Sequence, residues 1–348
     1  MATTPRHPEF YTRYGNPTVR TLENAVAALE HGEAALATAS GMAAIAAVIL
    51  GLVGRGGHIV AQRVLYGGSV GLLTKIVQRL GIEVTFVDQT EADAFAHAVG
   101  PGTRLFLLET PSNPLMRLTD LERVADIARS SGALTLVDNT LASPINQLPL
   151  DLGIDLVMHS ATKYLGGHSD ASAGIVVGAR RLIEDVWDTA YLLGATLDPF
   201  AAWLVLRGLR TLPMRVARHN QTALRVARHL SRHAAVCCVH YAGLESHPQH
   251  DLARRQMSGF GGVLSFEVEG GLVAAERVVG ALTLASRSAS FGSFSSLVVH
   301  PAAMWAGMMS TEQLVETGLP PGLIRLGVGF EDADAITADL DAALAKIQ

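Results

Sequence analysis

The chain of 348 residues is 49% hydrophobic and 17% charged, a composition that excludes a disordered protein and predicts a large buried core. Its formal net charge of −5 gives nucleic acid no broad basic surface, so we expect no nucleic-acid partner. The longest apolar run, Ala43 to Val53, is shorter than the about 20 residues of a membrane helix, so we expect no membrane partner either.

The first half of the chain alternates helix-like and strand-like segments. Its polar start, Met1 to Pro8, is no signal peptide, so we expect a cytoplasmic protein. The strand-like segments are rich in Val, Leu and Ile and almost continuously apolar, which predicts an α/β fold with a mostly parallel sheet. We expect helices near residues 18–30, 41–53, 68–80, 91–99, 119–131 and 180–193, and strands near 58–61, 84–88, 104–109, 134–138, 155–159 and 173–177. Thr119-Asp-Leu-Glu122 resembles a capping box that opens the fifth helix.

A long helical stretch follows, from Phe200 to Arg232. Pro213 should kink or break it, because proline lacks an N–H and its ring clashes with the preceding turn. Four arginines recur on one face of its second half, and in an acidic chain they predict a solvated stripe rather than a nucleic-acid surface. They are Arg218, Arg225, Arg228 and Arg232.

The last part of the chain mixes strands and helices in a smaller α+β unit. We expect strands near 236–241, 262–268 and 323–328, and helices near 247–256, 272–282 and 332–347. The adjacent Cys237 and Cys238 cannot form a disulfide framework and are expected to be small core residues. We therefore expect one domain over 18–211 and a second over 212–348.

Polar side chains follow successive strands of the larger predicted sheet. Asn113, Asp138 and the group Ser160, Thr162 and Lys163 all stand at carboxyl ends, where open α/β sheets bind ligands. A lone lysine there is either a solvated loop residue or a chemical group. Without further context both interpretations are equally open.

A glycine-containing turn, Thr38-Ala-Ser-Gly-Met42, leads directly into a predicted helix. Its backbone N–H groups and the helix dipole would hold a phosphate, with an ordinary helix start as the alternative. A phosphate site, two hydroxyls, an amine that can form an imine and a carboxylate that can face a pyridine nitrogen are together the requirements of pyridoxal phosphate. Tyr66 is the candidate for an aromatic face over the ring, unless it is an ordinary half-buried tyrosine.

Seven short segments extend this pattern along the chain. They are Tyr11-Thr-Arg-Tyr-Gly-Asn-Pro-Thr18, Ser40-Gly-Met42, Tyr66-Gly-Gly68, Glu109-Thr-Pro-Ser-Asn-Pro114, Val137-Asp-Asn-Thr140, Ser160-Ala-Thr-Lys-Tyr164 and Ile324-Arg-Leu326. Together they resemble the trans-sulfuration (Cys/Met metabolism) family, which includes cystathionine γ-synthases and γ-lyases, methionine γ-lyases and O-acetylhomoserine sulfhydrylases. The resemblance implies the pyridoxal-phosphate-dependent type I fold, similar to that of aspartate aminotransferase.

The resemblance also implies a role for each matching residue. Lys163 would form the imine with pyridoxal 5'-phosphate and move protons, Asp138 would face the pyridine nitrogen, and Tyr66 would stack on the ring and assist proton transfer. The further cofactor contacts implied are Asn113 at the phenolic oxygen, and Gly41, Met42, Ser160 and Thr162 at the phosphate. The substrate contacts implied are Arg325 as a bidentate partner of the α-carboxylate, Ser296, Asn113 and Ser295. No metal is implied.

Tyr11 and Arg13 match a pair that, in this family, reaches the phosphate of a neighbouring subunit. The resemblance therefore implies that residues 1–17 form an arm on that neighbour, and that the protein is a dimer with shared active sites. Two such dimers would form a tetramer. The segment before Tyr11 is shorter than is usual in the family.

Four positions depart from the family pattern. Ser295 stands where many members that handle cystathionine carry a glutamate, and serine cannot supply its charge. Trp305 and the following Ala306 replace two polar residues; the tryptophan lies either at the pocket edge or in a core or subunit contact. Gly327 replaces a common serine.

The expected reaction is γ-replacement on an activated homoserine derivative, as in a cystathionine γ-synthase or an O-acyl-homoserine sulfhydrylase. It would proceed through the Lys163 imine and a vinylglycine-type intermediate. Phe86-Val-Asp-Gln89 and Ser112-Asn-Pro-Leu115 look most like the γ-synthase branch. The alternative is γ- or β-elimination from methionine, cystathionine or cysteine. A catalytically idle protein on the same fold is a third interpretation. It is disfavoured by the joint presence of Lys163, Asp138, Tyr66 and Arg325.

Overall fold

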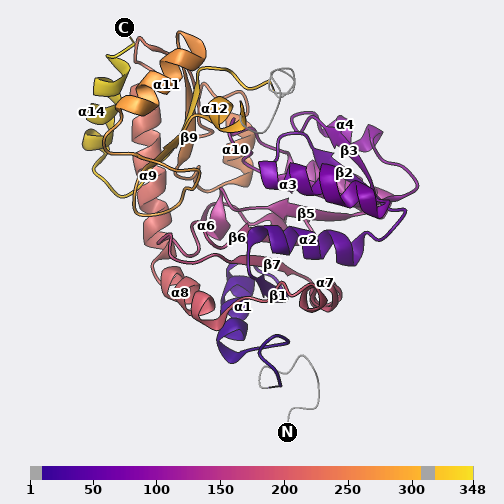
Figure 1. Cartoon of the computed structure of the whole chain (residues 1–348). Coiled ribbons are helices and arrows are strands. Elements are labelled where there is room, and N and C mark those ends of the chain that lie inside the picture. Colours follow the sequence, from indigo (N-terminus) through magenta and orange to yellow (C-terminus); the bar gives the residue numbers. More distant parts are fainter. Residues whose placement is uncertain (1–9, 307–317, 348) are drawn as a thin grey trace. The chain divides into compact units, whose positions relative to one another are not determined.

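The large sheet of the protein contains seven strands, as seen in a computed structural model that describes residues 10–306 and 318–347 (Figure 1). The strands are β1 (Ala34–Thr38), β2 (His58–Gln62), β3 (Glu83–Val87), β4 (Thr103–Glu109), β5 (Leu134–Asp138), β6 (Leu156–Ser160) and β7 (Gly174–Gly178), in the order β1-β7-β6-β5-β4-β2-β3. Strands β3, β2, β4, β5 and β6 run parallel, and β7 is antiparallel to both neighbours. The prediction of a mostly parallel sheet is therefore confirmed.

Helices cover both faces of this sheet. Successive side chains of a strand point to opposite faces, and they pack against different helices. Ile59 packs with α2 and α7 in one apolar cluster, and its neighbour Val60 packs with α4 and α5 in another. The helices are α1 (Pro17–Leu29), α2 (Gly41–Leu52), α3 (Gly67–Leu72), α4 (Ala92–His97), α5 (Leu121–Ser131), α6 (Ser143–Asn146), α7 (Arg180–Leu192) and α8 (Pro199–Leu209). Helix α3 continues through a π-helical turn, Leu73–Val77, and a 3₁₀ turn, Gln78–Leu80.

Two helix starts show how the sequence sets the boundaries. Asn16 caps α1 by accepting the Thr18 N–H, with Pro17 in the first turn. The predicted capping box at Thr119 is wrong by one residue: Asp120 caps α5 by accepting the Arg123 N–H. Thr119 is instead buried and donates its hydroxyl to Gln62.

The second unit has a five-stranded sheet in the order β10-β11-β12-β9-β8. Its strands are β8 (Val236–His240), β9 (Val263–Val268), β10 (Ser286–Arg287), β11 (Leu297–Val299) and β12 (Leu323–Gly327). Its helices are α9 (Leu212–Leu230), which starts at the boundary with the first unit, α10 (His250–Gln256), whose last residues belong to the first unit, α11 (Gly271–Ala281), α12 (Pro301–Ala306) and α14 (Ala333–Leu344). One apolar core joins α9, α11 and α14 to one face of this sheet.

The chain divides between the two units at Leu212 and Pro213, although the division is not a single cut. The first unit holds the chain up to Asn113, Arg117–Leu212 and Arg254–Ser258, and the second holds Pro114–Met116, Pro213–Ala253 and Gly259–Gln348. None of the helices described is long and apolar enough to cross a membrane.

Pro213 breaks the long helical stretch, as predicted. Helix α8 ends at Leu209 and α9 begins at Leu212, so the proline lies in a first turn, where no N–H is required. On α9, Arg218 donates to the Glu331 carbonyl at 3.3 Å and Arg225 pairs with Asp334. The arginine face is therefore used in part to hold the start of α14.

The two cysteines contradict the expectation that they are core residues. Cys237 and Cys238 are both exposed on β8, the edge strand of the small sheet. A shift in the pairing register between Val236 and Cys238 interrupts the in–out alternation of side chains there. The apolar sequence of β8 is therefore not sufficient to bury these two side chains in the core.

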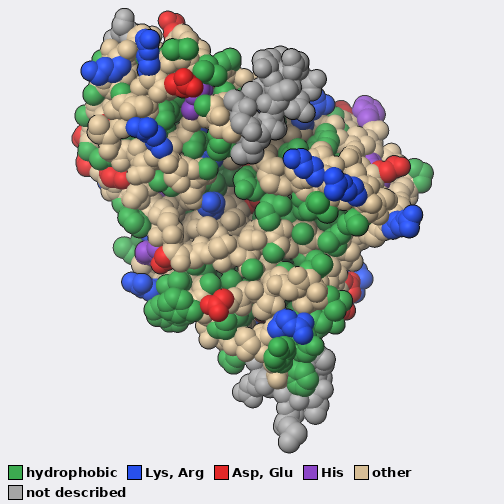
Figure 2. All heavy atoms as spheres, viewed as in Figure 1, with side chains coloured by type: hydrophobic (Ala, Val, Ile, Leu, Met, Phe, Trp, Pro, Cys, Tyr) green, Lys and Arg blue, Asp and Glu red, His purple; other side chains and the backbone are tan. Residues whose placement is uncertain are grey.

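Helix α8 exposes large apolar side chains. Phe200 is 65% exposed and Trp203 is 49% exposed, and their rings stack at 5.7 Å. Figure 2 shows hydrophobic side chains gathered on the surface at α8. A hollow of about 630 Å³ lies beside them, lined by α1 and α8 residues that include Ala25, Leu29 and Leu206.

Candidate active site

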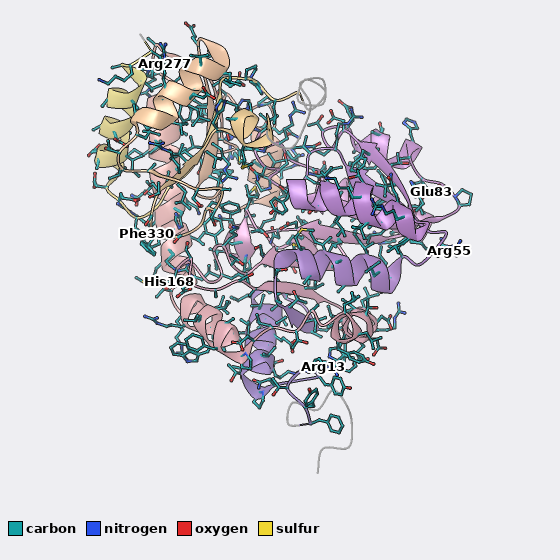
Figure 3. The ribbon with its side chains drawn as sticks, in the orientation of Figure 1. Arg13, Arg55, Glu83, His168, Arg277 and Phe330 are labelled. Atoms are coloured by element: carbon teal, nitrogen blue, oxygen red, sulfur yellow. The ribbon has the colours of Figure 1, made fainter. Side chains whose placement is uncertain are left out.

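The carboxyl ends of four parallel strands meet at one edge of the large sheet, and each ends on a polar residue. These residues are Gln62 of β2, Glu109 of β4, Asp138 of β5 and Ser160 of β6. Glu109 pairs directly with Asp138 in the strand register. Figure 3 shows His168, shortly beyond β6, on the side of the first unit opposite to Arg55 and Glu83, which lie at the amino ends of β2 and β3.

The turn before α2 lies directly on the end of β6. Ser40 caps the helix by accepting the Ala43 N–H at 3.1 Å. A Cβ added to Gly41 would lie 3.1 Å from the Ser160 Cβ, and one added to Gly174 of β7 would lie 2.2 Å from the Ser40 carbonyl oxygen. Because the first N–H groups of a helix have no partner within it, this packed turn can hold an anion beside Ser160.

Thr162 holds the segment that follows β6. Its hydroxyl accepts the Ala173 N–H at 3.0 Å and lies 3.3 Å from the Ala173 carbonyl oxygen. The turn between Ser160 and Ala173 is thereby tied to the start of β7, and Lys163 lies on it. The Lys163 N–H donates to the Ser160 carbonyl at 3.0 Å.

Lys163 differs from the other lysines of the chain in its position. The chain has three lysines, and only Lys163 follows a strand of the large sheet at its carboxyl end. Lys75 is exposed on the π-helical turn after α3, and Lys346 is exposed after α14. Any chemistry that needs a lysine amine at this edge therefore falls to Lys163.

Asp138 is connected to Ser160 through Thr140. Thr140 donates its N–H to the Asp138 carboxylate at 2.9 Å and also donates its hydroxyl to it, while the same hydroxyl accepts the Ser160 N–H at 2.8 Å. Burial raises the pKa of Asp138, and the Thr140 hydrogen bonds and nearby His159 oppose that rise. A cation placed against Asp138 would favour its ionised form.

Glu109 is a site residue to which the sequence pattern assigned no role. It is buried, and its carboxyl oxygens accept the Tyr66 N–H at 2.7 Å and the Asn113 N–H at 2.9 Å. Burial and the neighbouring Asp138 raise the pKa of Glu109 to about 8. The sequence signal for Glu109 was an acidic residue at the end of a buried strand beside Asp138. Its contact with Tyr66, 43 residues away, can be recognised only from the fold.

Tyr66 lies at the start of α3 with its side chain about half exposed. A Cβ added to Gly68 would lie 2.5 Å from the Tyr66 ring and 2.9 Å from the Met42 sulfur. The ring, the glycine and the start of α2 are therefore in contact. Tyr66, Met42, Ser160, Asp138 and Asn113 are all brought to this edge of the sheet.

Arg325 lies on β12 in the second unit, between β9 and β11, and is buried. Its Nη2 donates to the carbonyls of Ala289 at 2.9 Å and Ser290 at 3.1 Å. Burial lowers the pKa of Arg325 to about 10, which leaves it positively charged at neutral pH. A guanidinium has N–H groups besides those of Nη2, and these can donate charge-assisted hydrogen bonds to a carboxylate.

Ser296 and Ser295 lie just before β11 in the same unit. The Ser296 hydroxyl donates to Glu331 at 2.8 Å and accepts the Gly329 N–H at 2.9 Å, and Ser295 is partly buried. The side chain of Trp305 lies outside the described residues, so its two interpretations stay open.

Tyr11 and Arg13 lie on the chain leading into α1. Arg13 donates to the Tyr191 carbonyl at 3.2 Å and stacks over Tyr14 at 4.7 Å. Tyr11 is 56% exposed. Both side chains therefore lie at the surface of the first unit.

Comparison with known proteins identifies the family of the chain. The family model of Cys/Met metabolism pyridoxal-phosphate-dependent enzymes matches residues 2–345. The chain belongs to this family. It is 44% identical to an O-succinylhomoserine sulfhydrylase of Pseudomonas aeruginosa over 337 residues, which cover 97% of this chain and 84% of that protein. It is also 42% identical to an L-methionine γ-lyase of Fusobacterium nucleatum subsp. polymorphum over 340 residues, covering 97% and 86%.

A solved structure extends the comparison to the fold of this family member. A crystal structure of a cystathionine γ-synthase from Xanthomonas oryzae pv. oryzae in complex with aminoacrylate and cysteine matches with a TM-score of 0.93 and 42% identity, covering 97% of this chain and 87% of that one. The protein therefore has the type I fold of pyridoxal-phosphate enzymes, its cofactor is pyridoxal phosphate, and it is a transferase or a carbon–sulfur lyase.

The residues at the sheet edge fit this cofactor. A single lysine, a partly buried carboxylate and a helix start with an adjacent serine lie at the ends of neighbouring strands, which matches an aldehyde, a ring nitrogen and a phosphate. The lack of a side chain at Gly41 also leaves the helix N-terminus open beside Ser160.

Proposed function

We propose that this enzyme replaces the γ-substituent of an activated homoserine derivative with an incoming thiol or sulfide. Lys163, alone among three lysines in its position at the sheet edge, carries the proposal of pyridoxal-phosphate chemistry. The similarity to an O-succinylhomoserine sulfhydrylase and a cystathionine γ-synthase supports replacement as the outcome.

Lys163, Tyr66 and Asp138 are proposed to act together at the cofactor ring. The bound cofactor supplies an electron sink that makes the substrate carbons acidic. The Lys163 amine takes the Cα proton and moves protons between adjacent carbons, and Tyr66 assists while its ring lies against the cofactor. Asp138 holds a proton on the ring nitrogen, because an opposite charge nearby favours the protonated ring. The remaining cofactor contacts are Asn113 at the phenolic oxygen, and Gly41, Met42, Ser160 and Thr162 at the phosphate.

Arg325 is proposed to bind the substrate α-carboxylate. Its charge at neutral pH and its fixed Nη2 support this role. Ser296 is the second proposed contact, with Glu331 and Gly329 fixing its hydroxyl. Ser295 is proposed to face the distal part of the substrate, where an uncharged residue suits an acyl group better than the ammonium of cystathionine.

Product analysis tests replacement against elimination. The holoenzyme is incubated with O-succinylhomoserine, with and without cysteine or sulfide, and thioether or thiol product is measured against 2-oxobutyrate. Replacement predicts that the added nucleophile enters most of the product. If 2-oxobutyrate forms at the same rate and no nucleophile is incorporated, the enzyme is a γ-lyase, the second candidate function, which the similarity to the methionine γ-lyase favours.

We further propose that the protein is a homodimer, and that two dimers form a tetramer. Phe200 and Trp203 are exposed, and a hollow lies beside them. An exposed apolar patch of this kind supports a contact with another subunit. Residues 1–17 are proposed to contact a neighbour, with Tyr11 and Arg13 at its cofactor phosphate. A cytoplasmic location is also proposed, because its two cysteines are exposed, adjacent and free.

A further inference from the structure

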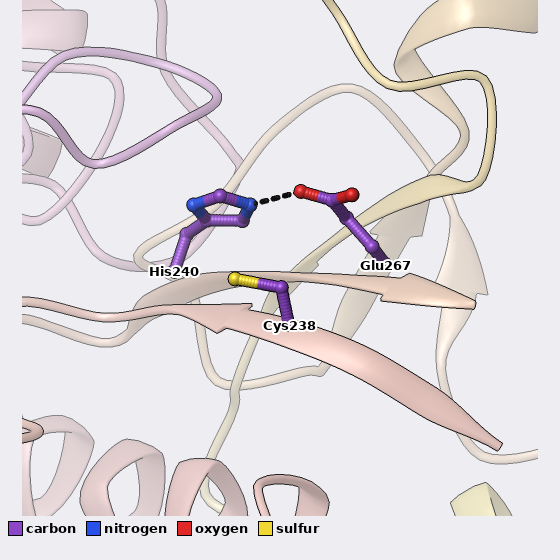
Figure 4. Close-up of side chains that lie close together, drawn as sticks. All are labelled: Cys238, His240 and Glu267. Atoms are coloured by element: carbon purple, nitrogen blue, oxygen red, sulfur yellow. Dashed lines mark hydrogen bonds and ion pairs between the residues drawn. The ribbon is translucent and has the colours of Figure 1, made fainter. Parts of the chain in front are cut away.

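A group of metal-binding side chains lies on the small sheet, on strands β8 and β9 (Figure 4). Cys238 pairs directly with Glu267 across the two strands, and His240 lies two residues beyond Cys238 on β8. One ligand atom from each residue lies within 4.8 Å of the other two. The His240 Nε2 is 2.6 Å from a Glu267 carboxylate oxygen.

The strand pairing places all three side chains on one face of the sheet. Residues two apart on a strand point the same way, and directly paired residues share a face. The intervening Val239 and its partner Phe266 pack in the core of the second unit, on the other face. The three polar side chains therefore point away from the helical layer, with Cys238 exposed and the other two partly buried.

A thiol, an imidazole and a carboxylate at this spacing are the donor types of zinc sites with three protein ligands and one open position. We propose that Cys238, His240 and Glu267 bind one Zn²⁺ ion. The sequence gives no hint of this site, because Glu267 stands 27 residues from His240 and only the β8–β9 pairing joins them.

Metal binding at this site should depend on pH. A cysteine binds a metal ion as the thiolate, so the metal must displace a proton from the Cys238 thiol. Affinity should therefore increase as the pH rises toward the thiol pKa. The other titratable groups nearby are Glu269 beside Cys237, and His247 and His250, of which His247 has its pKa lowered to about 4 and is neutral.

Cobalt substitution provides the direct test. The holoenzyme, freed of metal with a chelator and desalted, is titrated with Co²⁺, and d–d absorption is followed at wavelengths longer than the cofactor bands. We expect one equivalent per chain, displacement by Zn²⁺, and a rise in unfolding temperature on adding Zn²⁺, because an ion that binds only the folded state stabilises it.

Matched variants identify the ligands. Cys237→Ser removes the adjacent exposed thiol and should leave the titration unchanged. Cys238→Ser and His240→Ala should abolish the cobalt bands, and Glu267→Gln should weaken binding about tenfold or more. Retention of the cofactor absorption and of activity shows that each variant is folded. Equal binding by wild type and folded Cys238→Ser, or loss of binding in Cys237→Ser, would overturn the proposal.

Discussion

Glu109 links two loops of the candidate active site through one buried carboxyl group. Its oxygens accept N–H groups from Tyr66 and Asn113, which come from the loops after β2 and β4. Gln62 also fixes the backbone of Glu109, because its side-chain amide donates to the Glu109 carbonyl at 2.7 Å. We therefore regard Glu109 as a positioning residue for the loops that carry Tyr66 and Asn113.

The raised pKa of Glu109 leads to a prediction about stability. Its pKa rises from 4.5 to about 8 on folding, so the folded apoenzyme binds more protons than the unfolded chain between these values. The contribution of Glu109 to the free energy of unfolding should therefore decrease as the pH rises through this window. Denaturant unfolding of apoenzyme at several pH values should show a steeper loss in wild type than in Glu109→Gln, which cannot titrate.

Comparing Glu109→Gln with Glu109→Asp distinguishes the titration of Glu109 from a general loss of stability. Glu109→Asp keeps an ionisable group but shortens its reach, so it should retain the pH dependence and lose the hydrogen bonds to Tyr66 and Asn113. Parallel pH profiles for wild type and Glu109→Gln would show that Glu109 does not titrate in this window.

At the scale of elements, the start of α2 depends on close packing against β6. Gly41→Ala would place a Cβ 3.1 Å from the Ser160 Cβ and 3.2 Å from its Cα, so the turn must shift by a few tenths of an ångström. We expect the dissociation constant of the cofactor to increase about tenfold, or about 1.4 kcal/mol. Titration of the apoenzyme with pyridoxal phosphate measures it.

Gly280→Ala on α11 is the matched control for this substitution. Nothing lies within 4 Å of a Cβ added there, so cofactor affinity should not change, while alanine should raise helix stability by up to about 1 kcal/mol. Unchanged affinity in Gly41→Ala would mean that the α2 start does not hold the phosphate.

The sequence predicted those elements whose residue composition is typical of the secondary structure they form. The apolar strands β2, β4, β5 and β6 and the helices between them stand within a few residues of their expected positions. Strand β1 was missed because Ala34-Ala-Leu-Ala-Thr38 has little β-propensity and is held by its pairing with β7. The polar strand ends predicted Lys163 and Asp138, whereas Glu109 and the Cys238 group required strand register.

At the scale of the whole molecule, the proposal of shared active sites can be tested by complementation. Arg13→Ala should impair the neighbour's site, and Lys163→Ala should abolish its own. A hybrid dimer of the two variants would keep one complete site, so purified hybrids should recover about half of the wild-type activity. Each parent dimer should be inactive or strongly impaired.

The reciprocal hybrid distinguishes contact between chains from contact within a chain. A dimer of wild type with the double variant Arg13→Ala and Lys163→Ala has no complete site if Arg13 acts on its neighbour, and it should be inactive or strongly impaired. Half activity in this hybrid together with an inactive first hybrid would place Arg13 at the site of its own chain.

We propose that Lys163 holds the cofactor at the carboxyl edge of the large sheet. Borohydride reduction of the holoenzyme fixes pyridoxal phosphate to the amine that binds it, and peptide mass spectrometry then locates the label. We predict one phosphopyridoxyl group per chain on the peptide containing Lys163. A label on Lys75 or Lys346, or an unlabelled Lys163 in active enzyme, would contradict the assignment of the cofactor to Lys163.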